Sequence, residues 1–323
     1  MIGVIGAGVV GSRVTDQLVA SGQAVTIFDR DPYRARRLAA LHVRNGDAHA
    51  ADSLDDLRGI ETVITATGTP HAEVAIRLLE AGSNVVSCGD DMQDVERLLH
   101  LDTRARELGR TIVVGAAASP GLTGLLVWHL RERFDKIDEA HVAMHGTGGP
   151  DCARQHHRAL SGQSRGWHDG EWLRRPGGSG RELCWFPEPV GSYDCYRSEM
   201  VDPVLLHHAM PSLERVTARS SATRRDRFTS RLPMLTPPHA EGGMGAVRVE
   251  VRGFKGQARV VEVAGVAERV GQIAGVVAGA AALHIGAFKS GCQVLGSDGS
   301  PNDAIYQTIT TAGIRVLRFV GSS

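Results

Sequence analysis

The sequence opens on Ile2-Gly-Val-Ile-Gly-Ala-Gly-Val-Val-Gly11, a short apolar run that leads into a Gly6-x-Gly8-x-x-Gly11 turn. The residues Ile2–Ile5 are typical of a buried strand. Gly6 permits a tight turn, Gly8 lets the backbone approach a pyrophosphate, and Gly11 lets a helix pack closely on the strand. The pattern therefore predicts a dinucleotide-binding turn.

The segment after the turn continues this pattern. A helix is expected over Val9–Ala20, and Val9 and Val10 lie in its first turn, where free backbone N–H groups attract negative charge. A second strand, Ala24–Phe28, then leads to Asp29. A carboxylate at this distance from the glycines binds the hydroxyl groups of a ribose.

The residues around Asp29 bear on the choice between NAD and NADP. A carboxylate at this position repels a 2′-phosphate, which favours NAD. Arg30 and Arg34 favour NADP, because a guanidinium beside the acid can grip a 2′-phosphate, although it can also stack on adenine. The cofactor is therefore predicted to be NAD or NADP, with the balance toward NAD.

Composition limits the class of protein. The chain has 323 residues, and Lys plus Arg equal Asp plus Glu at 36 each, so no net field attracts nucleic acid or a membrane surface. The five cysteines form no C-x-x-C pair, which indicates reduced thiols. Since the first strand begins at residue 2 and leaves no room for a signal peptide, a cytoplasmic location is expected.

The order of expected elements predicts an α/β fold with a doubly wound parallel Rossmann sheet, followed by an inserted α+β substrate or dimerisation domain. We expect a dinucleotide-binding domain at 1–122, a substrate domain at 123–265, and a C-terminal helix and tail at 266–323 that return to the first domain. Within the first domain, 92–108 is expected to be one helix. The following strands and helices are expected further along the chain: helix Leu122–Phe134, strands Ile137–Met144, Glu182–Phe186, Val216–Ser220 and Ala246–Val251, and helix Glu268–Ile285.

Four loops carry a resemblance to a known family. They are the glycine turn with Asp29-Arg30, Ala66-Thr-Gly-Thr-Pro70, Cys88-Gly-Asp-Asp91 and Ser119-Pro-Gly-Leu122. Together they resemble the saccharopine dehydrogenase-like reductases over about residues 1–135. The resemblance implies a Rossmann domain, an inserted domain that binds substrate, dimerisation as a homodimer, and reduction of a substrate with NAD(P).

Ligands of a doubly wound sheet lie beyond the carboxyl ends of its strands, so the loops after strands are the best candidates for function. Thr67, Gly68 and Thr69 follow the fourth strand and are placed to run along the cofactor toward its nicotinamide. Gly89 follows the fifth strand. A helix start without a ligand also explains the Thr67–Pro70 segment.

The run His145–Arg158 is a glycine-rich loop that leads into an expected helix. Such a loop, with Arg154 and Arg158, can present N–H groups to a substrate carboxylate or phosphate. One of His145, His156 and His157 could move the proton that accompanies hydride transfer. The alternative is a flexible connection followed by a polar helix.

A second cluster lies in Cys184–Arg197, where four aromatic residues occur in a chain with only 5% aromatics. It is predicted to be either a substrate wall or a buried interface. Tyr193 and Arg197 are candidate substrate contacts, and Tyr196 is a further candidate proton donor.

No metal site is predicted. His141 and His145 would share a face of a strand but stand about 13 Å apart, too far for one zinc ion. No G-x-S-x-G elbow supports a serine nucleophile.

The pattern as a whole predicts an NAD(P)-dependent oxidoreductase that transfers hydride between nicotinamide and a carbonyl, imine or amine-bearing carbon of a small anionic metabolite. Two alternatives remain open. The chain could use bound NAD(P) without net redox, or it could be a regulatory module that senses the dinucleotide.

Overall fold

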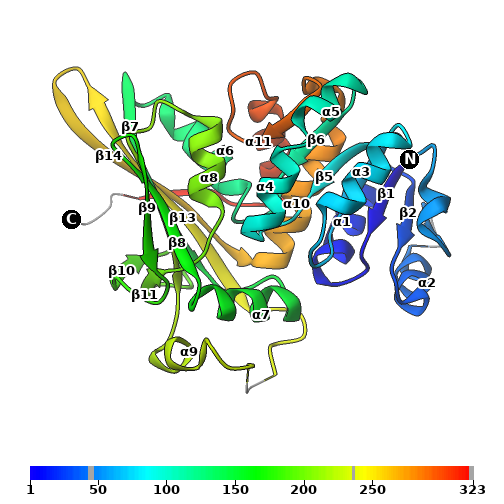
Figure 1. Cartoon of the computed structure of the whole chain (residues 1–323), viewed down its shortest axis with the longest axis horizontal. Helices are drawn as coiled ribbons and strands as arrows, with labels where there is room; N and C mark the ends of the chain where they lie inside the picture. Colours follow the sequence, from blue (N-terminus) through cyan, green and yellow to red (C-terminus); the bar gives the residue numbers. More distant parts are fainter. Residues whose placement is uncertain (43–46, 235–236, 320–323) are drawn as a thin grey trace. The chain divides into compact units, whose positions relative to one another are not determined.

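The computed structural model describes residues 1–42, 47–234 and 237–319. The chain divides into two compact units, which Figure 1 draws along the sequence from blue to red. Unit 1 comprises Met1–Ala117, Gly271–Leu295 and Gly299–Ala312. Unit 2 comprises Ala118–Val270, Gly296–Asp298 and Gly313–Ser323.

Unit 1 is built on a parallel sheet in the order β15-β6-β5-β4-β1-β2-β3. Its strands are β1 (Ile2–Ile5), β2 (Val25–Phe28), β3 (Ala48–Ala50), β4 (Thr62–Thr65), β5 (Asn84–Ser87), β6 (Thr111–Val114) and β15 (Gly291–Val294). The central strands are apolar and buried on both faces, as parallel strands between two helix layers must be. The strand order reverses between β1 and β4, which confirms the predicted doubly wound Rossmann sheet.

The helices of unit 1 are α1 (Val9–Ala20), α2 (Pro32–Leu41), α3 (Ala72–Glu80), α4 (Met92–Leu99), α5 (Asp102–Glu107), α10 (Val270–Leu283) and α11 (Asn302–Thr311), with short 3-10 turns at Leu54–Leu57 and Ile285–Ala287. Gly275 and Gly279 of α10 lie against α1, where a Cβ on either would press on Arg13 or Gln17. Small residues therefore allow α10, from the C-terminal part of the chain, to pack directly on the first helix of the sheet.

Two expectations for unit 1 need correction. The segment 92–108 forms two helices, α4 and α5, because the chain turns at His100 and Leu101. The turn brings the Asp102 carboxylate to the backbone N–H of Cys292, at 2.8 Å, and so fixes the start of β15. The strand β3 lies in a stretch for which the sequence predicted no element, because it is only three residues long.

Unit 2 contains a mixed sheet in the order β10-β11-β12-β7-β13-β14-β16, with β8 paired to β12 and β9 paired to β8. Its strands are β7 (Lys136–His145), β8 (Gln163–His168), β9 (Glu171–Pro176), β10 (Glu182–Trp185), β11 (Ser192–Arg197), β12 (Arg215–Ser221), β13 (Met244–Lys255), β14 (Ala258–Arg269) and β16 (Leu317–Phe319). β12 and β7 pair in parallel, and the other pairs are antiparallel, as the alternating segments predicted.

The helices of unit 2 are α6 (Leu122–Arg131), α7 (Pro150–Ala159), α8 (Asp202–Ala209) and α9 (Arg224–Thr229). The apolar face of the sheet includes Val142 and Val249, and α6 packs against its strands β7, β13 and β14. The buried carboxylate of Asp202, at the start of α8, accepts 2.8 Å hydrogen bonds from the Ser119 and Thr123 hydroxyls at the start of α6. This carboxylate therefore ties the two helices together.

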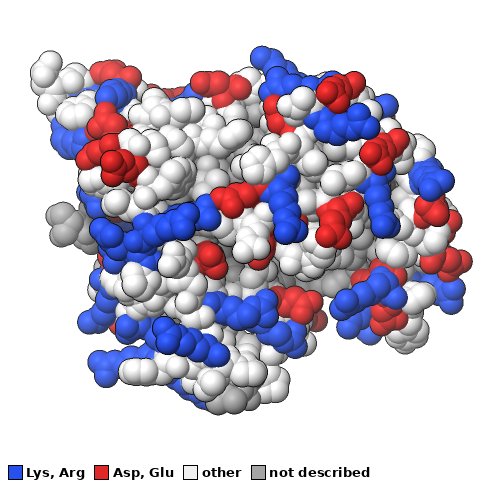
Figure 2. Space-filling model, in the orientation of Figure 1, with Lys and Arg blue, Asp and Glu red and all other residues white. Residues whose placement is uncertain are grey.

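The opposite face of this sheet carries charged side chains. Glu139 of β7 accepts hydrogen bonds from His141 at 2.9 Å and from Arg259 at 2.7 Å, and Arg252 lies between Glu250 and Glu139. The hydrogen bond from His141 and the positive charges of Arg252 and Arg215 lower the pKa of Glu139 to about 2. The face of the molecule drawn in Figure 2 likewise carries basic and acidic side chains interspersed over most of its surface.

Candidate functional site

The glycine turn after β1 is held by contacts that only glycine allows. Gly6 has a φ of 107°, and a Cβ there would lie 2.6 Å from the carbonyl oxygen of Ala66. A Cβ on Gly11 would overlap the carbonyl oxygen of Gly6. These two positions therefore bring β1, the loop after β4 and helix α1 together as closely as backbones can pack.

Gly8 differs from its two neighbours in the motif. It is exposed, and a Cβ there would meet nothing within 4 Å. Gly8 is also the N-cap of α1, which has no side-chain cap and no acidic residue in its first turn. The first N–H groups of α1, near the half-buried Val9 and Val10, are therefore open to an anion, as a dinucleotide pyrophosphate requires.

Asp29 lies beside this turn at the carboxyl end of β2. Its carboxylate accepts a 2.7 Å hydrogen bond from the Ala7 N–H and a 2.9 Å bond from the Asp31 N–H. The two bonds fix the carboxylate next to the glycine turn and leave Asp29 partly exposed. Arg30, directly after it, is exposed. The residues present therefore fit the adenosine half of a dinucleotide.

The loops after β4 and β5 hold the remaining predicted cofactor contacts. Thr67, Gly68 and Thr69 are exposed, and a Cβ on Gly68 would meet nothing within 4 Å. Gly89 is buried instead, and its N–H donates to the Ser87 hydroxyl at 3.1 Å. Gly89 is therefore covered by the protein and cannot contact a ligand through a free surface, whereas the Thr67–Thr69 loop is open to a ligand.

Sequence reasoning missed a buried histidine that connects these two loops. His71 is 1% exposed, and its ring nitrogens lie within hydrogen-bond distance of Ser87 and of the Thr67 carbonyl. A single histidine after a proline reads as an ordinary helix start, and its partner Ser87 is 16 residues further on. The only local signal is the Thr-x-Thr-Pro-His run itself.

In unit 2, His145 lies at the carboxyl end of β7 in an aromatic setting. Its ring stacks on Tyr193 of β11 with centroids 3.8 Å apart, and its Nδ1 lies 2.8 Å from the Ser221 hydroxyl of β12. Phe186 approaches from the side at 6.1 Å. Burial lowers the pKa of His145, so the neutral imidazole predominates at pH 7.

The other predicted histidines and arginines lie on α7. His157 is buried, with its Nε2 3.1 Å from the Thr229 hydroxyl, while His156 is half-buried. Arg154 and Arg158 are on the exposed side of the helix, and Arg154 forms a 2.7 Å ion pair with Asp151. The structure therefore places His157 and the two arginines on different sides of α7.

Two further candidates lie side by side on β11 with different surroundings. Tyr196 is 3% exposed, and the guanidinium of Arg227 lies 4.2 Å from its ring centre. Arg197 is half-buried, and its pKa is lowered by burial and by the nearby positive charges of Arg219 and Arg175. In the region where Figure 1 draws β10, β11 and α9, Figure 2 shows basic side chains gathered on the surface.

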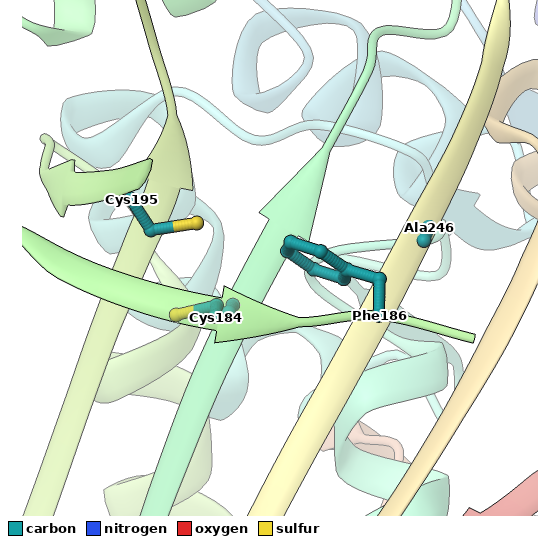
Figure 3. Close-up of a cluster of buried hydrophobic side chains, with 5 residues drawn as sticks. Cys184, Phe186, Cys195 and Ala246 are labelled. Atoms are coloured by element: carbon teal, nitrogen blue, oxygen red, sulfur yellow. The ribbon is translucent and has the colours of Figure 1, made fainter. Parts of the chain in front are cut away.

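The cysteine-containing part of the aromatic cluster is a small core. Figure 3 shows Cys184 and Cys195 on neighbouring strands with Phe186 beside them, and all three are buried together with Ala143 and Ala246. Both thiols are free. Within the predicted aromatic stretch, Cys184 and Phe186 are thus interior, whereas Trp185 is 53% exposed and Tyr193 is 43% exposed.

The fold and the glycine turn define a Rossmann-type protein with a second, α+β unit. Residues 2–85 match the family model described as the TrkA-N domain. The chain is 35% identical over 82 residues to the Trk system potassium uptake protein TrkA of Mycobacterium tuberculosis, a match that covers 24% of this chain and 37% of that protein. The chain therefore spans little more than a third of the length of this curated relative.

Solved structures extend the likeness to the whole chain. Saccharopine dehydrogenase (L-Glu forming) from Saccharomyces cerevisiae has a TM-score of 0.72 at 14% identity, with 99% of each chain covered. A probable dehydrogenase from Thermotoga maritima has a TM-score of 0.51 at 13% identity, with 98% of each chain covered. The resemblance to saccharopine dehydrogenase expected from the sequence is thus confirmed at the level of the fold.

Within the described residues, no helix combines the length and the apolar character needed to cross a bilayer.

Proposed function

We propose that this protein is an NAD(P)-dependent oxidoreductase that acts on a small anionic metabolite. The observation that carries the proposal is the glycine turn, with Gly8 open and the N-terminus of α1 uncapped next to the fixed carboxylate of Asp29. The fold shared with a saccharopine dehydrogenase over the whole chain supports a redox role for the dinucleotide.

The residues of unit 1 have separate roles in holding the cofactor. The N–H groups near Val9 and Val10 bind the pyrophosphate, Asp29 binds the adenosine ribose, and the Thr67–Thr69 loop receives the nicotinamide end. Because two backbone N–H groups hold the Asp29 carboxylate, it lies beside the ribose and disfavours a 2′-phosphate. NAD is therefore the proposed cofactor.

When bound, the nicotinamide supplies the hydride chemistry on a carbonyl, imine or amine-bearing carbon. His145 is proposed to accept or donate the accompanying proton, since burial keeps it neutral at pH 7 and Ser221 and Tyr193 fix its ring. Arg197 is proposed to bind the substrate anion, because an anion would relieve the repulsion between Arg197, Arg219 and Arg175.

The test is NADH consumption by the purified chain with a panel of keto acids, alone and with amines, followed by nicotinamide absorbance. Turnover in one mixture supports the oxidoreductase, and Arg197→Gln then raises KM about tenfold or more with little change in kcat. Arg174→Gln, which changes an exposed arginine on β9, is the matched control and leaves KM unchanged. Absence of turnover with every substrate contradicts the proposal.

The match to TrkA favours a second candidate, a regulatory module that senses the dinucleotide. Such a module binds NAD and NADH with very different affinities and consumes neither. A third candidate is an enzyme that uses bound NAD(P) without net redox. Such an enzyme retains NAD through purification and converts its substrate with no net absorbance change. Consumption of NADH separates the oxidoreductase from the other two candidates. NAD that remains bound through purification, together with conversion of a substrate, separates the third candidate from the regulatory module.

A further inference from the structure

The loops after β4 and β5 are linked through one buried side chain. His71, just before α3, has Nδ1 2.8 Å from the Ser87 hydroxyl and Nε2 2.9 Å from the Thr67 carbonyl oxygen. Ser87 ends β5, and Thr67 begins the exposed loop after β4. A single ring therefore spans from the interior of the sheet to the loop proposed to receive the nicotinamide.

The hydrogen-bond partners fix the donor on one side of the ring. The Thr67 carbonyl can only accept, so Nε2 carries a hydrogen and donates to it. The Gly89 N–H donates to the Ser87 oxygen at 3.1 Å, and the same hydroxyl lies 2.8 Å from Nδ1. Hydrogen bonds thus run from Gly89 through Ser87 and His71 to Thr67.

The backbone of His71 is fixed independently of its ring. The buried Asp94 carboxylate accepts the His71 N–H at 2.7 Å and the Ala72 N–H at 3.0 Å, which caps the first turn of α3. The Thr65 hydroxyl also lies 3.0 Å from Nδ1 and can donate to the Val86 carbonyl oxygen. The backbone of His71 is thus held by Asp94, and the Nε2 side of its ring faces the Thr67 carbonyl.

We propose that His71 is a positioning residue for the dinucleotide: its Nε2–H holds the Thr67 carbonyl and thereby sets the Thr67-Gly68-Thr69 segment in the conformation that receives the nicotinamide end. The inference rests on the proposed function, because it concerns the same cofactor. Within the described residues, the exposed threonines of this segment have no comparable link to the sheet interior other than the His71 ring.

The test compares His71→Gln with His71→Asn in an NADH titration followed by nicotinamide fluorescence. The Gln amide nitrogen can replace Nε2 and reach the Thr67 carbonyl, whereas the shorter Asn amide can replace only Nδ1 at Ser87. We expect Asn to weaken NADH binding about tenfold and Gln to keep binding within about threefold of wild type, with similar losses of Tm. Equal binding by both variants overturns the inference.

If His71→Asn does not fold, two variants that each remove a single hydroxyl group test the same inference. Ser87→Ala removes the hydroxyl that orients the ring, and Ser83→Ala removes an equally buried hydroxyl at the other end of β5, where it bonds the Ile60 carbonyl at 2.6 Å. We expect only Ser87→Ala to weaken NADH binding, by about threefold or more, while both lower Tm by similar amounts.

The outcomes separate the two proposals. If Ser87→Ala binds NADH as tightly as Ser83→Ala, His71 has only a structural role and the inference fails while the proposed function stands. If the wild-type chain binds neither NADH nor NADPH, the proposed function itself fails.

Discussion

Gly8 and Gly11 are three residues apart in one motif, yet their surroundings assign them opposite roles. A Cβ on Gly8 enters open space, and a Cβ on Gly11 overlaps the Gly6 carbonyl oxygen. Gly8→Ala is therefore expected to leave Tm within a degree or two of wild type and to weaken NADH binding about tenfold or more, because the methyl group occupies the position proposed for the pyrophosphate.

Gly11→Ala is the matched comparison for Gly8→Ala. It is expected to destabilise the fold by about 2 kcal/mol or more, since the turn and α1 must move apart. Thermal unfolding and NADH fluorescence, measured on both variants, test this assignment. A large loss of Tm in Gly8→Ala with unchanged binding would contradict it.

His145 has a pH dependence whose sign follows from burial. Burial lowers its pKa, so the proton-accepting imidazole persists as pH falls below the ordinary histidine value of about 6.5. In the oxidation direction, kcat/KM is expected to stay high through pH 6.5 and to fall only below the lowered pKa. His145→Gln is expected to lower kcat about a hundredfold or more and to remove this limb of the profile. A limb that persists in His145→Gln assigns it to another group.

Residues whose contacts are set by near neighbours could be predicted from the sequence. The glycine turn and Asp29 lie within one strand-helix-strand unit, and their spacing alone predicts that they lie together. His71 and Ser87 could not be paired in this way, because their contact depends on β4 and β5 lying in adjacent positions of the sheet. The stacking of His145 on Tyr193 likewise depends on strands far apart in the chain.

Among the elements, α6 and α8 depend on one buried carboxylate. Asp202 accepts hydrogen bonds from Ser119 and Thr123, and it is 1% exposed. Asp202→Ala leaves both hydroxyls without this acceptor and is expected to cost about 3 kcal/mol of unfolding free energy in urea titrations. Asp151→Ala, which removes an exposed partner of Arg154, is expected to cost less than about 1 kcal/mol. Equal costs would show that the Asp202 contacts contribute little.

Elements with a strong period were predictable, and short polar ones were not. The sequence predicted β1 and α1 with the bounds that the structure has, because the two apolar segments are flanked by glycines at Gly6 and Gly22. The β8–β9 hairpin was missed, since β9 is mostly exposed and carries two arginines, and neither strand has an alternating apolar pattern. Its turn at Asp169-Gly170, where both residues have positive φ, was the available signal.

For the whole molecule, three partly buried histidines predict how stability depends on pH. Burial lowers the pKa of His145, His207 and His284 in the folded state, so the unfolded state binds protons first as pH falls. Their contribution is fully present above about pH 6.5 and is lost as pH falls through the lowered values. Tm is therefore expected to drop between about pH 7 and pH 5, and a Tm that rises over this range would contradict the account.

Glu139 predicts a second loss of stability at lower pH, which we call the acidic stage. Its folded pKa of about 2 lies below its ordinary value of 4.5, so its stabilising effect is present above pH 4.5 and is lost as pH falls toward 2. Glu139→Gln is expected to lower Tm at pH 7 and to flatten this acidic stage. An unchanged acidic stage in Glu139→Gln would assign it to other carboxylates.

The whole fold is shared with a saccharopine dehydrogenase at only 14% identity. Few identical residues are therefore needed to specify this fold, and only some of its features can be predicted from the sequence. Unit 1 is specified by apolar strands and glycine turns, which any Rossmann sheet requires. Unit 2 is specified by pairings between distant strands, such as β12 with β7, which no local pattern reveals. The sheet and its glycine turn were therefore predictable, whereas the contacts between distant residues of unit 2 were not.

The most direct test of the central claim is a titration of the wild-type chain with NADH and with NADPH, followed by nicotinamide fluorescence. Asp29→Ala and, as control, Asp31→Ala, which changes the N-cap of α2, are titrated in parallel. The wild type is expected to bind NADH more tightly than NADPH, and the preference is expected to shift toward NADPH by about tenfold in Asp29→Ala alone. A chain that binds neither dinucleotide, or an Asp29→Ala variant with the wild-type preference, would contradict it.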